Sequence, residues 1–320
     1  MDIPGPTTRL RLDVAYDGTR FSGWTRQPEL RTVQGELEAA LATVFRRHPP
    51  APALTVAGRT DAGVHATGQV AHLDLGEAQL AGLTARQRGK VARPEEDPAD
   101  ALRRRLNGIA GLASDLYVSR VSVAPLGFDA RFSAIWRRYE YRVADTLAVR
   151  NPLLQNHTLW HPAALDADEM DRAARALVGL WDWAAFCKPR EGSTTVRSLQ
   201  EFTWHRDDFG VLIASVQADA FCHSMVRALV GASIAVGEGK LPAERLTELR
   251  DEQQRGSEFI VAPAKGLTLL EVGYPQPREY GARAEQTRAR RDPVPAGDHG
   301  ADDSSTGPAR FDASQRDRLI

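Results

Sequence analysis

The stretch GRTDAGVHATGQV occupies residues 58–70 and places one acidic residue, Asp61, between two glycines. Gly58 and Gly63 permit backbone angles or close approaches that a side chain would prevent. Arg59 stands two residues before Asp61, so the two side chains project to the same side of an extended loop. A guanidinium beside a carboxylate favours its ionised form. An ionised carboxylate in a rigid loop is a candidate nucleophile or general base, although the pattern also fits an ordinary loop salt bridge.

The composition of the whole chain narrows the class of protein. Its 320 residues are enough for one large or two modest domains. Lys and Arg number 41, and Asp and Glu number 42, which gives a formal net charge of -1. An anionic partner must therefore be met by a local basic patch and not by the molecule as a whole. With no signal-peptide core and no apolar span, the sequence predicts a cytoplasmic protein without a membrane segment.

The cysteines and histidines indicate neither a disulfide framework nor a metal site. Cys187 and Cys222 are the two cysteines, and they form no CxxC pair. We therefore expect reduced thiols, in agreement with a reducing cytoplasm. His65 and His72 lack the further clustered ligands that a closed site needs, so we predict no metal.

The spacing of apolar residues predicts a mixture of strands and helices. Alternation or short apolar runs predict strands at 10–16, 54–57, 71–75, 116–123, 136–143, 196–204, 210–218 and 267–272. Helical spacing predicts helices at 33–44, 100–106, 168–180, 221–236 and 242–254. Thr32 is the expected N-cap of the first helix. This order of elements indicates an α+β fold with largely antiparallel sheets in two comparable halves.

The order of elements and the composition also predict how the chain is divided into parts. We expect an N-terminal leader over 1–8, an N-terminal α+β half with the Asp61 loop over 9–125, and a C-terminal α+β half over 126–280. Residues 281–320 have few large apolar side chains and no periodicity, which predicts a disordered tail.

A second informative stretch is FDARFSAIWRRYEYR at 128–142. In a strand over 136–143, Arg137, Tyr139 and Tyr141 share one face, while Arg138 lies on the other. One interpretation is a core face of aromatic residues with arginines at its edge. The other is a nucleic-acid surface, on which arginines hold phosphates and tyrosines stack on bases. The pattern alone leaves both interpretations open.

A third stretch, FCHSMVRALVG at 221–231, places His223 and Arg227 four residues apart on one helical face. An arginine beside an apolar stripe most often forms a structural pair. A functional arginine needs an anionic partner from elsewhere in the fold, for which Asp61 is the candidate. We expect His223 to be structural.

These stretches together resemble the tRNA pseudouridine synthase A family. The resemblance runs through AYDGTRFSGWTRQ (15–27), TVQGELEAAL (32–41), AGRTDAGVHATGQVAH (57–72), FDARFSAIWRRYEY (128–141) and FCHSMVRALVG (221–231), in this order. It implies the pseudouridine synthase fold, with two α+β halves that meet at a central catalytic cleft. It also implies a homodimeric isomerase that converts uridine to pseudouridine at positions 38–40 of the tRNA anticodon stem-loop.

The resemblance extends to individual residues. It implies that Asp61 is the catalytic aspartate and that Tyr139 contacts the target base and assists its proton transfer. Arg227 would pair with Asp61 and orient it, and Arg59 would help to position the flipped nucleotide. Arg59 and Arg227 together are expected to keep Asp61 charged and aimed.

The expected partner is the anticodon stem-loop of tRNA, with Arg137 and Arg138 as its phosphate contacts. Isomerising uridine involves no redox change and no net hydrolysis, so we expect no cofactor. Two other functions compete with this one. A non-catalytic RNA-binding protein would use the same arginines and tyrosines without Asp61. A carboxylate-dependent nucleoside hydrolase would need a second acid, for which the sequence has no paired-carboxylate signature.

Overall fold

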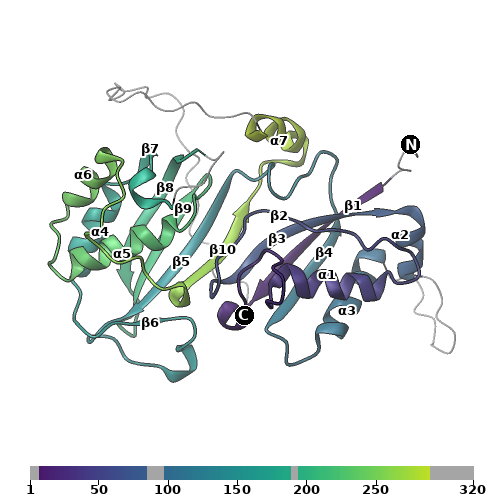
Figure 1. Cartoon of the computed structure of the whole chain (residues 1–320), viewed down its shortest axis with the longest axis horizontal. Helices are drawn as coiled ribbons and strands as arrows, with labels where there is room; N and C mark the ends of the chain where they lie inside the picture. The colour runs from purple at the N-terminus through teal and green to yellow at the C-terminus, as the bar shows by residue number, and fades with distance from the viewer. Residues whose placement is uncertain (1–6, 85–96, 189–193, 289–320) are drawn as a thin grey trace.

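The computed structural model describes residues 7–84, 97–188 and 194–288. Within these residues, ten strands form one sheet in the order β4-β1-β3-β10-β5-β9-β8-β7, with β2 beside β3 and β6 beside β5 (Figure 1). The strands are β1 (Thr7–Tyr16), β2 (Thr55–Val56), β3 (His65–Gly76), β4 (Leu116–Val123), β5 (Trp136–Ala144), β6 (Leu159–Trp160), β7 (Gly179–Asp182), β8 (Val196–Arg206), β9 (Leu212–Ala218) and β10 (Leu267–Gly273). The predicted α+β class is confirmed.

Helices cover one face of each half of the sheet. The helices are α1 (Val33–Val44), α2 (Glu77–Thr84), α3 (Pro98–Ala110), α4 (Ala167–Arg175), α5 (Met225–Gly237), α6 (Arg245–Glu252) and α7 (Tyr280–Arg288). In Figure 1, α1 and α3 lie over the half that contains β1, β3 and β4, and α4 and α5 lie over the half that contains β5, β8 and β9. The core therefore lies between the sheet and these helices.

Strand β10 joins the two halves into one sheet. It pairs in parallel with β3, where Leu269 lies opposite Ala66. It also pairs antiparallel with β5, where the same Leu269 lies opposite Tyr139. Although β10 is near the end of the described chain, it occupies the centre of the sheet. The loop that leads into β3 and the side chains of β5 are thereby brought to the same region.

Several local predictions are confirmed because they depend on neighbouring residues. Arg137, Tyr139 and Tyr141 of β5 are buried, whereas Arg138 on the alternate face is partly exposed. Thr32 caps α1, and its hydroxyl accepts a hydrogen bond from the backbone N–H of Gly35 at 3.2 Å.

Three predicted helices are shorter than the apolar pattern indicated, and the one expected at 242–254 spans Arg245–Glu252. The helix expected at 168–180 ends at Arg175, and the chain enters β7 at Gly179. The helix expected at 221–236 begins at Met225, because Ser224 has φ 64° and ψ 10°. A left-handed residue cannot continue a right-handed helix, so the apolar stripe overestimates its length.

The first part of the predicted disordered tail is instead a helix. Residues of the tail up to Arg288 form α7, whose Tyr280 is buried against Phe128 and Tyr274 with ring centroids 5.3 and 6.3 Å apart. Buried Ala284 and the ion pair of Arg288 with Asp129 at 3.2 Å also hold this short helix, although the segment has little periodicity. Residues 289–320 and most of the predicted leader lie outside the described residues. No helix among the residues described is long and apolar enough to cross a membrane.

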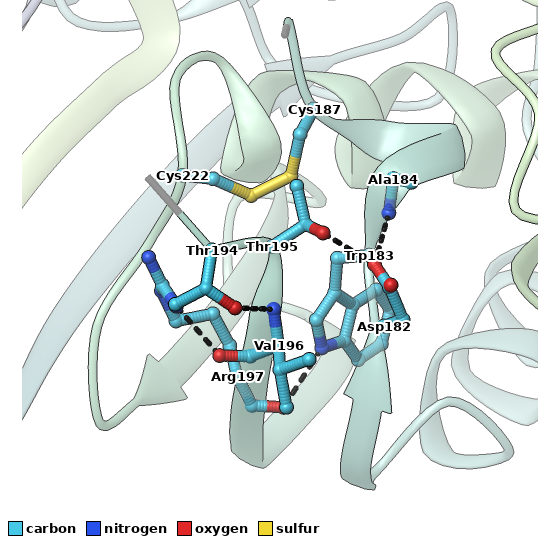
Figure 2. The surroundings of a disulfide bond; sticks show 9 residues. All are labelled: Asp182, Trp183, Ala184, Cys187, Thr194, Thr195, Val196, Arg197 and Cys222. Carbon is cyan, nitrogen blue, oxygen red and sulfur yellow. Dashed lines mark hydrogen bonds between the residues drawn. A yellow bond between two sulfur atoms is a disulfide. The ribbon is translucent and has the colours of Figure 1, made fainter. Parts of the chain in front are cut away.

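The expectation that the two cysteines do not pair is wrong. Cys187 follows the short helix η3 (Ala184–Phe186), Cys222 precedes α5, and their sulfurs are bonded (Figure 2). The two Cα atoms are 5.7 Å apart, a separation typical of disulfides. The backbone N–H of Lys188 donates to the carbonyl of His223 at 3.0 Å and holds the two segments together. Cysteine spacing in the sequence contains no information about this approach.

The disulfide leads to a prediction about the number of reactive thiols before and after reduction. Protein purified without reductant and then denatured should show no reactive thiol, and two after reduction. Reduction should also lower the melting temperature, because the bond joins two cysteines that are 35 residues apart and so restrains the unfolded chain. In the chain-entropy model, a loop of this length stabilises the folded protein by about 4 kcal/mol. Two reactive thiols in the unreduced protein would contradict the pairing, and a Cys222→Ala variant provides the one-thiol reference.

Candidate active site around Asp61

The loop that carries Asp61 connects β2 to β3 and is fastened to the N-terminal half by its backbone. Trp24 donates its backbone N–H to the carbonyl of Thr60 at 3.0 Å, and Gly63 donates to the carbonyl of Phe21 at 3.2 Å. Within the loop, the N–H of Val64 donates to the carbonyl of Asp61 at 3.2 Å. The carboxylate therefore projects from a closed turn.

One of the two glycines around Asp61 is required by the backbone. Gly63 has φ 79°, a left-handed conformation that side chains disfavour. Gly58 has no such angle, and a Cβ there would meet only Arg137 Nε at 4.0 Å. The close approach instead occurs at Gly18, where a Cβ would lie 2.0 Å from the carbonyl oxygen of Val64. The glycine prediction thus holds for Gly63, and Gly18 supplies the second constraint.

Buried polar side chains form a hydrogen-bond network with the loop. The hydroxyls of Tyr16 and Thr60 are 2.8 Å apart, and Gln69 Nε2 donates to the Tyr16 hydroxyl at 3.3 Å and to the carbonyl of Gly58 at 2.9 Å. Burial raises the pKa of Tyr16 to about 12, so its phenol stays neutral and can act as a donor. This network fixes the residues on both sides of Arg59.

His65 ties the end of the loop to both halves of the protein. Its Nδ1 accepts from the N–H of Gly18 at 3.0 Å, and its Nε2 is 3.1 Å from the carbonyl of Lys265. Burial lowers the pKa of His65, so the ring is neutral and Nε2 is the donor. Among the described residues, Asp17, His65 and His157 bring three potential metal ligands within 4.8 Å of one another. Both nitrogens of His65 are already committed, so we assign no metal here.

The carboxylate of Asp61 forms an ion pair with Arg227 from α5. Arg227 Nη1 donates to Asp61 Oδ2 at 3.2 Å, and its Nε donates to the carbonyl of Ala262 at 2.7 Å. The Asp61 side chain is 31 % exposed and that of Arg227 24 %. The pairing that the resemblance implied is therefore present, and it crosses from the N-terminal to the C-terminal half. A partly exposed carboxylate in this position can reach a ligand without leaving its partner.

Two further side chains approach Asp61, and both belong to the segment before α5. Ser224 Oγ lies 3.5 Å from Oδ2, and His223 Nε2 lies 3.7 Å from Oδ1. His223 was expected to be structural, and no role was expected for Ser224. Both residues precede α5 in the same segment that carries Arg227, and this closeness in the sequence is the signal that could have identified them.

Tyr139 lies in the same region, and its phenol is neutral and buried. The side chain is 8 % exposed, and its ring packs edge-on against Phe221 with centroids 5.2 Å apart. Burial raises the pKa of Tyr139, and the nearby Tyr16 and Asp61 raise it further. Tyr139 therefore offers an O–H group and not a phenolate.

Arg59 does not support Asp61 in the expected way. It is exposed and makes no hydrogen bond or ion pair with any of the described residues. Arg59 is instead a guanidinium available to an anionic ligand.

Arg137 and Arg138 have different surroundings. Arg137 is 9 % exposed and donates to the carbonyls of Asp219 at 2.6 Å, Ala57 at 2.9 Å and Arg131 at 3.1 Å. Arg138 lies on the opposite face of β5 and ion-pairs with Glu271 Oε2 at 3.3 Å. This geometry favours a structural role for Arg137 over the predicted phosphate contact. Arg138 is accessible but faces away from Tyr139.

The sequence that forms this site is similar to the sequences of one family of known proteins. The sequence profile of a family described as tRNA pseudouridine synthase matches residues 173–275. The tRNA pseudouridine synthase A of Leifsonia xyli subsp. xyli is 62 % identical over 284 residues, covering 89 % of this chain and 98 % of the relative. Proteins of the same name from Streptomyces griseus and Mycobacterium leprae are 50 % identical over 281 residues (88 % and 93 % covered) and 45 % identical over 283 residues (88 % and 95 % covered).

The surroundings of the two arginines predict opposite effects of substitution. Arg137→Met removes the donor from two buried carbonyls, those of Asp219 and Ala57, and from the partly buried carbonyl of Arg131, and should destabilise the protein by on the order of 3 kcal/mol. Arg138→Met removes a solvent-exposed pair and should change stability by about 0.5 kcal/mol or less. Thermal unfolding measures the first effect, and the salt dependence of RNA binding tests whether either arginine contacts phosphate. An unfolding temperature unaffected by Arg137→Met would argue against its structural role.

Proposed function

This chain belongs to the tRNA pseudouridine synthase A family, and we propose that it isomerises uridine at positions 38–40 of the tRNA anticodon stem-loop with Asp61 as its catalytic carboxylate. Family membership makes it an isomerase that acts on tRNA. The observation that supports the catalytic assignment is the ion pair of Asp61 with Arg227 in the region of the buried phenol of Tyr139.

The reaction needs a group that acts on the sugar and a group that moves a proton on the base. The N1–C1′ bond breaks, the base turns, and a C5–C1′ bond forms. C5 then loses its proton and N1 gains one, so the product has the same atoms as the substrate. A uridine in a paired stem must first leave the stack to bring C1′ within reach of a side chain.

Asp61 is the group that acts on the sugar. Its ionised carboxylate either attacks C1′ or removes the proton from C2′ to give a glycal-like intermediate, and both routes need a charged, oriented oxygen. Arg227 provides the orientation, because its own Nε is fixed to the backbone of residue 262. The partial exposure of Asp61 leaves room for the ribose to approach.

Tyr139 is the candidate for the proton on C5. Because burial raises its pKa, the phenol is not a preformed base at neutral pH. Its oxygen accepts the C5 proton only while its own proton passes to solvent, from which N1 gains one, so Tyr139 acts as a relay. The edge-on contact with Phe221 fixes the ring in which this hydroxyl sits.

The tRNA contacts and the assembly complete the proposal. Arg59, exposed and without a partner among the described residues, would bind a phosphate or fill the space of the flipped nucleotide. Arg138 remains a predicted contact to the tRNA backbone, and Arg137 supports the start of the catalytic loop through Ala57. The homodimer and the cytoplasmic location remain predictions of the sequence analysis.

Asp61→Asn tests the catalytic assignment. The amide is nearly isosteric, so the loop should persist, and loss of a partly exposed ion pair should cost about 1 kcal/mol or less. We expect a folded protein that binds tRNA and forms no pseudouridine, even in long single-turnover incubations. Asp74→Asn is the matched control, since it also removes a carboxylate from an arginine pair, with Arg9, away from the site. Pseudouridine formed by the Asp61→Asn protein would overturn the assignment.

Tyr139→Phe tests the proton relay. The ring and its contact with Phe221 remain, so affinity for tRNA should change little, while the rate of product formation should fall by orders of magnitude. Tyr141→Phe is the control from the same strand and face, because among the described residues its hydroxyl donates to the carbonyl of Pro263, at 2.8 Å, and not to Asp61. It should lose about 1 kcal/mol of stability and keep its turnover. Normal turnover by Tyr139→Phe would leave this residue only a packing role.

A further inference from the structure

Ser224 has an unusual backbone and an unusual partner for its side chain. It is the N-cap of α5, a position at which serine normally accepts a hydrogen bond from an N–H of the first helical turn. Ser224 makes no such bond. Its φ of 64° places it in the left-handed region, which is costly for a residue with a Cβ. The hydroxyl is turned toward Asp61 Oδ2 instead, at 3.5 Å.

The two oxygens of the Asp61 carboxylate consequently differ. Oδ2 is the acceptor for both Arg227 Nη1 at 3.2 Å and Ser224 Oγ at 3.5 Å. Oδ1 accepts no hydrogen bond from the described residues, and the imidazole of His223 lies 3.7 Å from it, within ion-pairing distance. Oδ2 is therefore held by two donors, whereas Oδ1 has only the longer contact with His223 among the described residues.

The segment that presents Ser224 is anchored at several points. Cys222 is bonded to Cys187 (Figure 2), and the carbonyl of His223 accepts from the N–H of Lys188 at 3.0 Å. Phe221 packs edge-on against Tyr139. A left-handed serine persists only where its surroundings impose it, and such strain is concentrated at functional sites. These anchors supply that constraint next to the carboxylate.

We propose that Ser224 is a positioning residue for Asp61. With Arg227, it holds Oδ2 and limits rotation about the Cβ–Cγ bond, so that Oδ1 is the oxygen presented to the sugar. The two donors come from the N-cap and the first turn of the same helix, so the carboxylate and α5 form one rigid unit. This inference rests on the proposed catalytic role of Asp61 and adds which of its oxygens reacts and what selects it.

Three substitutions separate the hydroxyl from the backbone conformation. Ser224→Gly removes the hydroxyl and relieves the left-handed strain, so its melting temperature should be equal or higher. Ser224→Ala removes the hydroxyl and keeps the strain. Ser224→Thr keeps the hydroxyl but places a β-branched residue at positive φ, so its melting temperature should fall. Stability and positioning thus change in opposite directions across the series.

The measurements are the single-turnover rate of pseudouridine formation, the Kd for tRNA and the melting temperature of the full chain. We expect Ser224→Gly and Ser224→Ala to lose about tenfold in rate with an unchanged Kd, the effect of one lost hydrogen bond. Ser224→Thr should retain most of the rate despite its lower melting temperature. Ser119→Ala is the control, because this exposed hydroxyl of β4 donates only to the carbonyl of Asp13 at 3.1 Å.

Two results would overturn the inference. If the rates followed the melting temperatures, with glycine fast and threonine slow, Ser224 would be structural. If Ser224→Gly kept the full rate while Asp61→Asn was inactive, the role of Ser224 would fail and the proposed function would stand. Pseudouridine formation by Asp61→Asn in the same assay would identify failure of the proposed function itself.

Discussion

The pairing of β10 with both β3 and β5 is the interaction on which the rest of the structure depends. Leu269 lies opposite Ala66 on one side and Tyr139 on the other, so the strand after the Asp61 loop and the strand of the phenol are one strand apart. Without β10 the two halves would form separate sheets, joined by side-chain contacts such as those of Arg227 with Asp61 and of Arg137 with Ala57. Because backbone hydrogen bonds set the spacing, the site inherits the rigidity of the sheet.

Around the charged pair, the structure places neutral polar groups. Burial keeps the phenols of Tyr16 and Tyr139 protonated and the imidazole of His65 neutral. Tyr16 and His65 hold the loop by hydrogen bonds without adding a buried charge that would need its own partner. The charge of Asp61 lies where the side chain is partly exposed, beside Arg227. A carboxylate arranged in this way is both oriented and accessible, which a reaction at a sugar carbon requires.

The arginines of the site differ in whether they serve stability or function. Arg137, buried under the loop, bonds to carbonyls of three separate segments. Arg227 uses one nitrogen for the backbone and another for Asp61. Arg59 is exposed above them. The same guanidinium group therefore has three roles: in Arg137 it stabilises the fold, in Arg227 it orients the carboxylate, and in Arg59 it is available for an anionic ligand. The degree of burial of each arginine decides its role.

The sequence by itself determined those features that depend on neighbouring residues: the alternation of β5, the cap at Thr32, the left-handed Gly63 and most strand positions. Its motifs also identified Asp61, Tyr139 and Arg227 as a set, through resemblance and not through periodicity. Only the tertiary structure decided that Cys187 meets Cys222, that α5 begins after a left-handed Ser224, that α7 forms, and that Arg137 is buried while Arg59 is free. The physical reason is that side-chain periodicity reports which face a residue occupies, whereas contacts between distant segments decide what covers that face.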